Sequence, residues 1–175
     1  MTDETGDNNS RGIRVSRRQL LSMGAVAGVA VGTGTIPVTG NAATPPTMAM
    51  PEVNVAPLDE IKAGSQRVFG YPDSQSPAIL LRLDGPVEGG VGPDQSIVAY
   101  SMLCTHKGCP VGWNAEQKML ICPCHWSSFD PALKGRMIIG QGSQGLAQIT
   151  LRVVDGGVNA VGVDGLIYGR QTNIL

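Results

Sequence analysis

The chain has 175 residues, of which 42% are hydrophobic and 15% charged, and its formal net charge at pH 7 is −1. It lacks the excess of lysine and arginine that binds nucleic acids, so we expect no nucleic-acid partner. Its 24 glycines and 12 prolines favour short elements joined by turns. A chain of this size is expected to form one main domain.

The first 43 residues carry the features of an export signal. Arg17 and Arg18 form a twin-arginine pair, an apolar stretch follows, and small residues occupy positions 40–43. This pattern resembles the signal of the twin-arginine (Tat) pathway, which is cleaved after the small residues. We therefore expect residues 1–43 to be removed and residues 44–175 to form a domain in the periplasm.

The apolar stretch of this segment is a poor membrane helix. A spanning helix needs about 20 apolar residues, whereas repeated glycines interrupt the stretch and Pro37 follows it. We expect no membrane contact after cleavage. The alternative is that the segment stays as an anchor, with the domain facing the periplasm.

The remainder of the chain is predicted to be all-β. Short apolar or alternating runs between glycines and prolines predict strands, and only residues 57–63 suggest a short helix. The predicted architecture is an antiparallel sandwich or barrel. The predicted strands cover residues 66–71, 78–83, 96–100, 119–121, 137–139, 148–154, 158–163 and 166–168.

Two connections stand out by composition. Residues 84–95 are rich in glycine and polar residues, which predicts a surface loop that serves as a connector. The step Asp155-Gly156-Gly157 separates two alternating apolar runs, and such a step is a strong signal for a β-hairpin.

All four cysteines and both histidines of the chain fall in one window, within CTHKGC at 104–109 and CPCHW at 122–126. Cys104 with His106 has the form CxH, and Cys122 with His125 has the form CxxH. Such pairs are the ligand spacing of a [2Fe–2S] centre in which two thiolates hold one iron and two imidazoles hold the other.

Two other uses of these residues compete with an iron–sulfur cluster. A structural zinc site also takes two cysteines and two histidines, but its ligands usually come as CxxC and HxxxH pairs. A scaffold of two disulfides would leave both histidines without a role, and four cysteines allow three pairings. The cluster explains more of the pattern.

The two boxes resemble those of disulfide-bearing Rieske proteins. The resemblance implies that Cys104, His106, Cys122 and His125 ligate the cluster, on two loops that form a cluster-binding subdomain. It also implies that a disulfide joins the two remaining cysteines, Cys109 and Cys124. A disulfide persists in the oxidising periplasm, in agreement with the predicted export.

Three further positions of the second box follow from the same resemblance. Ser127 matches the family serine whose hydroxyl donates to a bridging sulfide. Phe129 stands where high-potential relatives have a tyrosine that donates to a cysteine sulfur, and Phe129 cannot donate. Trp126 replaces a glycine and is expected either to cover the cluster, to contact a partner or to fill the core. The proline-rich third loop of quinol-oxidising relatives is replaced by GQGSQG at 140–145.

The predicted function is electron transfer within an oxidoreductase complex. The boxes, the phenylalanine at 129 and the Tat signal resemble the small subunit of arsenite oxidase. That resemblance implies a molybdopterin-containing large subunit as partner, and a c-type cytochrome or cupredoxin as electron acceptor. The chain itself would carry out no substrate chemistry.

The alternative function is the Rieske subunit of a quinol–cytochrome c oxidoreductase. The interrupted apolar stretch, the residues at 126 and 129 and the absence of the proline-rich loop argue against it. The Rieske proteins of ring-hydroxylating systems lack the loop disulfide and work in the cytoplasm, so they fit less well.

Overall fold

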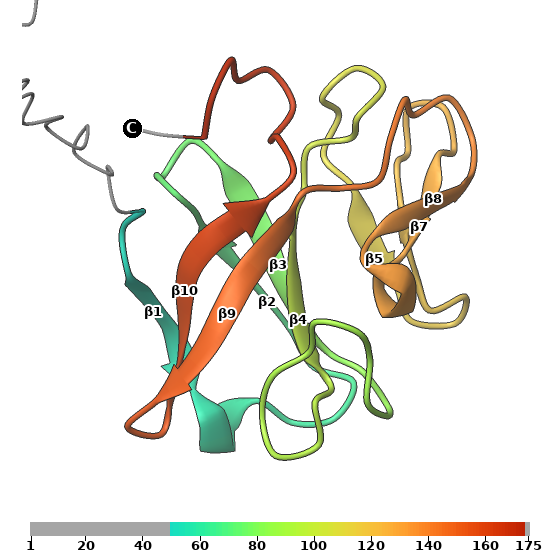
Figure 1. The fold of residues 1–175 in the computed structure, drawn as a ribbon. Helices are drawn as coiled ribbons and strands as arrows, with labels where there is room; N and C mark the ends of the chain where they lie inside the picture. Colours follow the sequence, from blue (N-terminus) through green and yellow to red (C-terminus); the bar gives the residue numbers. More distant parts are fainter. Residues whose placement is uncertain (1–49, 174–175) are drawn as a thin grey trace, which may run out of the picture. The chain divides into compact units, whose positions relative to one another are not determined.

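The computed structural model describes residues 50–173 of the chain. The predicted export signal at 1–43 therefore lies outside the described residues. The described part consists of two antiparallel sheets and two short 3-10 helices (Figure 1). This confirms the predicted all-β antiparallel class. No helix of residues 50–173 has the length and apolar character needed to span a membrane.

The larger sheet has six strands in the order β1-β10-β9-β4-β3-β2 and curves into a barrel-like shape. Its strands and the short helix η1 are β1 (Val53–Pro57), η1 (Leu58–Glu60), β2 (Gln66–Gly70), β3 (Pro77–Arg82), β4 (Ile97–Ser101), β9 (Gln148–Val154) and β10 (Gly157–Asp164).

The smaller sheet is inserted between β4 and β9 and has four strands in the order β5-β6-β7-β8. Its strands are short, and a 3-10 helix begins directly after β7, where the Asp130 carboxylate accepts a hydrogen bond from Ala132 N at 2.8 Å. These elements are β5 (Gly112–Asn114), β6 (Met119–Ile121), β7 (Ser128–Asp130), η2 (Pro131–Leu133) and β8 (Arg136–Ile139).

Strands β3 and β4 are buried on both faces, which explains their continuous apolar sequences. Successive side chains of a strand point to opposite faces. Accordingly, Ala78 and Leu80 of β3 pack into the core inside the larger sheet, whereas Ile79 and Leu81 pack into a second core. This second core also contains Leu120 and Phe129 of the smaller sheet, together with both free cysteines, so it joins the two sheets.

The hairpin predicted at 155–157 is confirmed. Asp155 and Gly156 both have positive φ, at 47° and 74°. Val154 pairs with Gly157 across the turn. Two successive residues with positive φ match the right-handed twist of the flanking strands.

The strand predicted at 166–168 is wrong. The segment forms a turn, in which Arg170 N donates to Ile167 O, and the Asn173 side chain accepts from Ile167 N. The Tyr168 ring packs so closely on Gly108 that a Cβ on Gly108 would lie 2.8 Å from it. Residues 166–168 therefore pack against the loop of the first box and do not pair with a strand.

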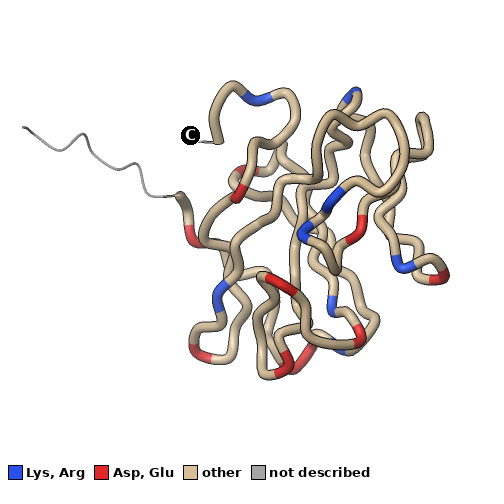
Figure 2. Tube along the Cα trace, turned by 45° about the vertical axis from the view of Figure 1, so that its right-hand side comes forward, with Lys and Arg blue, Asp and Glu red and all other residues tan. Residues whose placement is uncertain are grey.

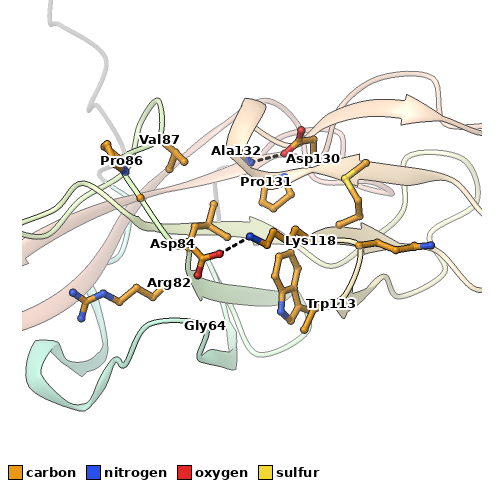
Figure 3. A pocket seen from close by; sticks show the side chains of 15 residues that line it. Gly64, Arg82, Asp84, Pro86, Val87, Trp113, Lys118, Asp130, Pro131 and Ala132 are labelled. Carbon is orange, nitrogen blue, oxygen red and sulfur yellow. Dashed lines mark hydrogen bonds and ion pairs between the residues drawn. The ribbon is translucent and has the colours of Figure 1, made fainter.

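A pocket of about 410 Å³ lies where the 84–95 loop meets the smaller sheet (Figure 3). The Trp113 indole and Pro131 form part of its wall, and the Lys118 ammonium lies 2.6 Å from the Asp84 carboxylate at its rim. Lys118 immediately precedes β6, whereas Cys122 follows that strand. The pocket is therefore at the end of β6 away from the second box.

Candidate metal centre

The two boxes form similar loops at one end of the smaller sheet. In the first loop Cys104 N donates to Cys109 O at 2.9 Å, and Gly108 N donates to Cys104 O at 2.8 Å. In the second loop Cys122 N donates to Ser127 O at 2.8 Å, and Trp126 N donates to Cys122 O at 2.9 Å. In each loop these hydrogen bonds close a turn that begins at Cys104 or Cys122 and includes the histidine of the same box.

The cysteines and histidines of the boxes differ in burial. Cys104 and Cys122 are each 1% exposed and are free thiols. His106 is half-buried and His125 is exposed. The two imidazole rings meet edge-on, with centroids 4.7 Å apart and planes at 76°. The arrangement puts sulfur inside and imidazole toward solvent.

Two observations on these side chains fit a bound metal cluster. Burial raises the pKa of the Cys104 thiol, and the neighbouring Cys122 thiol raises it further, while backbone N–H groups of His106 and Lys107 oppose the rise. Two thiolates this deeply buried need a nearby cation. In addition, His106 Nδ1 is buried without a hydrogen-bond partner among the described residues, and a metal ion at this atom would satisfy it.

The disulfide between Cys109 and Cys124 is present and joins the two loops, with Cα atoms 6.5 Å apart. The sulfur atoms of Cys109, Cys122 and Cys124 lie within 4.8 Å of one another. This trio does not make a metal site, because two of its sulfurs are bonded to each other and have no thiolate to offer. The disulfide instead lies beside a predicted cluster ligand.

The three second-box positions have different surroundings. Ser127 is fully buried, and its hydroxyl accepts a hydrogen bond from Gln141 N at 2.9 Å, which leaves the hydroxyl proton to donate elsewhere. Phe129 is fully buried in the same core as Cys104 and Cys122. Trp126 is 72% exposed and has φ of 60°. It therefore does not fill the core.

The third loop is held by hydrogen bonds and close glycine contacts in place of prolines. The Thr105 hydroxyl donates to Gln144 O at 2.7 Å, and the Ser143 hydroxyl donates to Thr105 O at 3.3 Å. A Cβ on Gly140 would lie 2.3 Å from Ser127 Cα, so only glycine allows this approach. Thr105 was not predicted to have a role, and its position inside the first box was the only signal for it.

Comparisons with known proteins agree with this geometry. The profile of the Rieske [2Fe-2S] domain matches residues 52–149. The chain belongs to the Rieske family. Its cofactor is a [2Fe–2S] cluster, and the individual assignment of Cys104, His106, Cys122 and His125 as ligands stays a prediction.

The relatives include subunits of two kinds of oxidoreductase. The iodate reductase subunit IdrB of Denitromonas iodatirespirans is 37% identical over 163 residues, which cover 91% of this chain and 86% of that protein. The cytochrome bc1 complex Rieske iron-sulfur subunit of Streptomyces lividans is 44% identical over 64 residues, which cover 36% of this chain and 38% of that subunit. The chain is thus an electron-transfer subunit of Rieske type.

A solved structure confirms the fold. The soluble domain of Rieske protein II from Sulfolobus acidocaldarius superimposes with a TM-score of 0.62 at 23% identity, over 70% of this chain and 82% of that domain. At this identity the likeness establishes the architecture alone.

Proposed function

We propose that Cys104 and Cys122 hold one iron of the cluster and that His106 and His125 hold the other. The observation that carries this proposal is the pair of edge-on imidazoles outside two buried thiols, at the end of the smaller sheet. The cluster supplies one-electron redox chemistry. The exposed His125 ring provides the route by which electrons reach a partner, and the buried core around the thiols excludes water.

Metal analysis tests the ligand assignment. The purified chain is expected to contain about two irons and two acid-labile sulfides, with the electron paramagnetic resonance signal of mixed histidine and cysteine ligation in the reduced state. Stoichiometric zinc without iron would refute the proposal.

The proposed complex is a periplasmic oxidoreductase with a molybdopterin-containing large subunit. The resemblance of both boxes to the small subunit of arsenite oxidase supports arsenite as its substrate. Arsenite oxidation releases two electrons, whereas the cluster holds one. The large subunit must therefore retain the second electron, and this chain passes electrons singly to a c-type cytochrome or cupredoxin.

Iodate reduction is a second candidate for the activity of the proposed complex. It is favoured by the similarity to the iodate reductase subunit, which extends over 91% of this chain. Electrons would then flow in the opposite direction, from the periplasmic carrier through this chain to the large subunit. Quinol oxidation has less support. The similarity to the bc1 subunit covers 36% of the chain, and a cytochrome b6-f complex iron-sulfur subunit that matches 83% of the chain is 27% identical, against 37% for the iodate reductase subunit.

The direction of electron flow separates these candidates. In the purified complex, arsenite should reduce the oxidised cluster if arsenite is the substrate, and iodate should oxidise the reduced cluster if iodate is. The isolated chain is the control in both cases, since direct chemical oxidation by iodate would not need the large subunit. Reduction by a quinol, with no response to arsenite or iodate, would select the quinol–cytochrome c function.

We also propose export through the Tat pathway, on the basis of the segment at 1–43. Replacing Arg17 and Arg18 by lysine should retain the cluster-loaded protein in the cytoplasm. The mass of the periplasmic protein should correspond to cleavage near residue 43. A full-length chain in the membrane fraction would instead indicate the anchored alternative.

A further inference from the structure

Three of the four cysteine sulfurs of the two boxes lie together. Cys109 and Cys124 form the disulfide between the loops, and the free thiol of Cys122 lies beside them, with all three sulfur atoms within 4.8 Å of one another. The second loop maintains this proximity, because the hydrogen bond from Trp126 N to Cys122 O closes a turn that includes Cys124. The Cys122 thiol is therefore positioned to attack the neighbouring disulfide.

The surroundings of the three sulfurs favour attack at Cys109. In thiol–disulfide exchange, the attacking sulfur bonds to one sulfur of the disulfide and the other leaves as a thiolate. Cys124 is exposed, whereas Cys109 is half-buried. Water therefore solvates a departing thiolate better at Cys124. Attack at Cys124 would instead join Cys122 to Cys124 around a single residue, Pro123, whose ring restricts the backbone.

We propose that the Cys122 thiol exchanges with the Cys109–Cys124 disulfide when no iron holds it. Cys122 gives its proton to solvent and its sulfur bonds to Cys109 Sγ. The bond from Cys109 to Cys124 breaks, and the Cys124 thiolate takes up a proton. The numbers of thiols and disulfides are unchanged, so the step needs no oxidant or reductant. The inference rests on the proposed ligand role of Cys122, since a sulfur bound to iron is not free to attack.

The exchange removes a predicted ligand of the cluster. After it, Cys122 belongs to a disulfide and has no thiolate to offer to iron, while the new thiol is on exposed Cys124. A chain that forms the disulfide before it receives its cluster therefore loses the ability to bind one. Iron that binds first holds Cys122 and leaves Cys109 and Cys124 to pair with each other.

The test maps the disulfides of the full chain with and without its cluster. A chelator removes the iron without reductant or oxygen, free thiols are alkylated after increasing times, and the tryptic peptides are analysed by mass spectrometry. Trypsin cleaves after lysine and arginine, which are blue in Figure 2. Cleavage after Lys107 and Lys118 puts Cys104, Cys109 and the second box in three separate peptides. Fragmentation of the second-box peptide between its two cysteines shows which of them is alkylated.

Two variants separate the attacking thiol from its neighbour. Cys122→Ser removes the attacker, and Cys104→Ser is the matched control, because it removes the other buried free thiol and keeps Cys122. In the cluster-free state, Cys104→Ser should replace the Cys109–Cys124 disulfide by Cys109–Cys122 over minutes to hours, with Cys124 newly alkylated. Cys122→Ser should keep the original disulfide over the same time.

The wild type provides a measurement that needs no variant. In the cluster-free chain, alkylation of Cys122 should decline with time, and uptake of added iron and sulfide should decline at the same rate. Brief treatment with dithiothreitol before the addition should restore the uptake. In the chain with its cluster, alkylation of Cys122 on unfolding should stay constant, because the cluster protects its sulfur until then.

Three outcomes would overturn the inference. A Cys109–Cys124 disulfide that persists in the cluster-free wild type and in Cys104→Ser would overturn it and leave the ligand assignment standing. Loss of this disulfide at the same rate in Cys122→Ser would show that another thiol attacks. Exchange at equal rates with and without the cluster would also refute Cys122 as a ligand, so failure of the proposed function gives a distinct result.

Discussion

The two sheets of this protein are stabilised in different ways. The larger sheet has strands of five to eight residues, and β4 is buried along its whole length. The smaller sheet has strands of three or four residues, and β8 is mostly exposed. Strands this short bury little apolar surface, so the smaller sheet depends on links between its loops: the disulfide, the third-loop hydrogen bonds and, by our assignment, the cluster.

The two sheets meet at Tyr100 of β4. Its side chain is fully buried, and its hydroxyl donates to Pro131 O in η2 at 2.7 Å. Gly135 packs against the same ring, where a Cβ would lie 2.9 Å away. The larger sheet thus serves as the base on which the loops of the smaller sheet are positioned.

The largest expected effect comes from changing a predicted ligand in the smaller sheet. His125→Cys replaces a neutral ligand by a thiolate, and the added negative charge should lower the midpoint potential by roughly several hundred millivolts. A redox titration followed by visible absorbance measures it. Gln144→Cys, in the exposed third loop, controls for the added thiol and should leave the potential near that of the wild type. A small shift in His125→Cys would mean that His125 is not a ligand.

Two buried leucines allow the sheets to be compared directly. Leu80 lies in the core of the larger sheet, and Leu120 lies in the core shared with the free cysteines. Each change to alanine should cost about 2–5 kcal/mol of unfolding free energy, measured by urea denaturation. Only Leu120→Ala should also speed the bleaching of the cluster. Equal bleaching rates in the two variants would show that the larger sheet protects the cluster as much as the smaller one does.

The sequence was sufficient for five of the six strands of the larger sheet, because these five have apolar or alternating patterns of five residues or more. The runs around β3 and β4 and the Asp155-Gly156 turn are visible in the residues themselves. Strands β5 (GWN) and β7 (SFD) were missed, because each is three residues long and mixes polar with apolar residues. Strand β6 is equally short and was predicted, because its three residues, MLI, are all apolar. Strand β1 was missed as well, because Asn54 and Pro57 interrupt its pattern.

The candidate site was predictable in its residue types and less so in its surroundings. The spacing of cysteine and histidine is a local property, and the disulfide implied by the resemblance is present. The exposure of Trp126 and the contact of Thr105 with Gln144 depend on where distant segments meet, which no local pattern reveals. The apolar residues at 166–168 were misleading for the same reason, since Tyr168 packs on a loop 60 residues away in sequence.

Removing the disulfide tests how far the smaller sheet depends on its crosslinks. Cys109→Ala should lower the unfolding free energy by less than the about 2–4 kcal/mol of a typical disulfide, because the cluster already joins the two loops. The expected result is faster cluster loss with a modest change of potential. In the chain without its cluster, Cys109→Ala should lower the unfolding free energy by more than it does in the chain with its cluster. Equal costs with and without the cluster would show that the cluster does not join the loops.

A smaller effect is expected from restoring a hydroxyl at position 129. Phe129 lies in the same core as both free cysteines, and Phe129→Tyr adds a donor there. If the new hydrogen bond favours the reduced cluster by about 1 kcal/mol, the potential rises by about 40 mV, from about 59 mV per tenfold change in equilibrium constant. A redox titration measures this. An unchanged or lower potential would show that the side chain at 129 does not reach a cluster sulfur.

The smallest expected effect is a change in acid sensitivity at the base of the larger sheet. Hydrogen bonds from Arg82 and then Ser96 hold the pKa of Asp94 below its ordinary value of 3.8. Because the pKa is lower in the folded state, this contribution to stability is present above the ordinary value and is lost as the pH falls through the folded one. Asp94→Asn should therefore flatten the decline of unfolding free energy below about pH 4, with Ser96→Ala intermediate, in urea denaturation at a series of pH values. If the unfolding free energy of Asp94→Asn falls as steeply with decreasing pH as that of the wild type, the acid-sensitive groups lie elsewhere, in the smaller sheet or its loops.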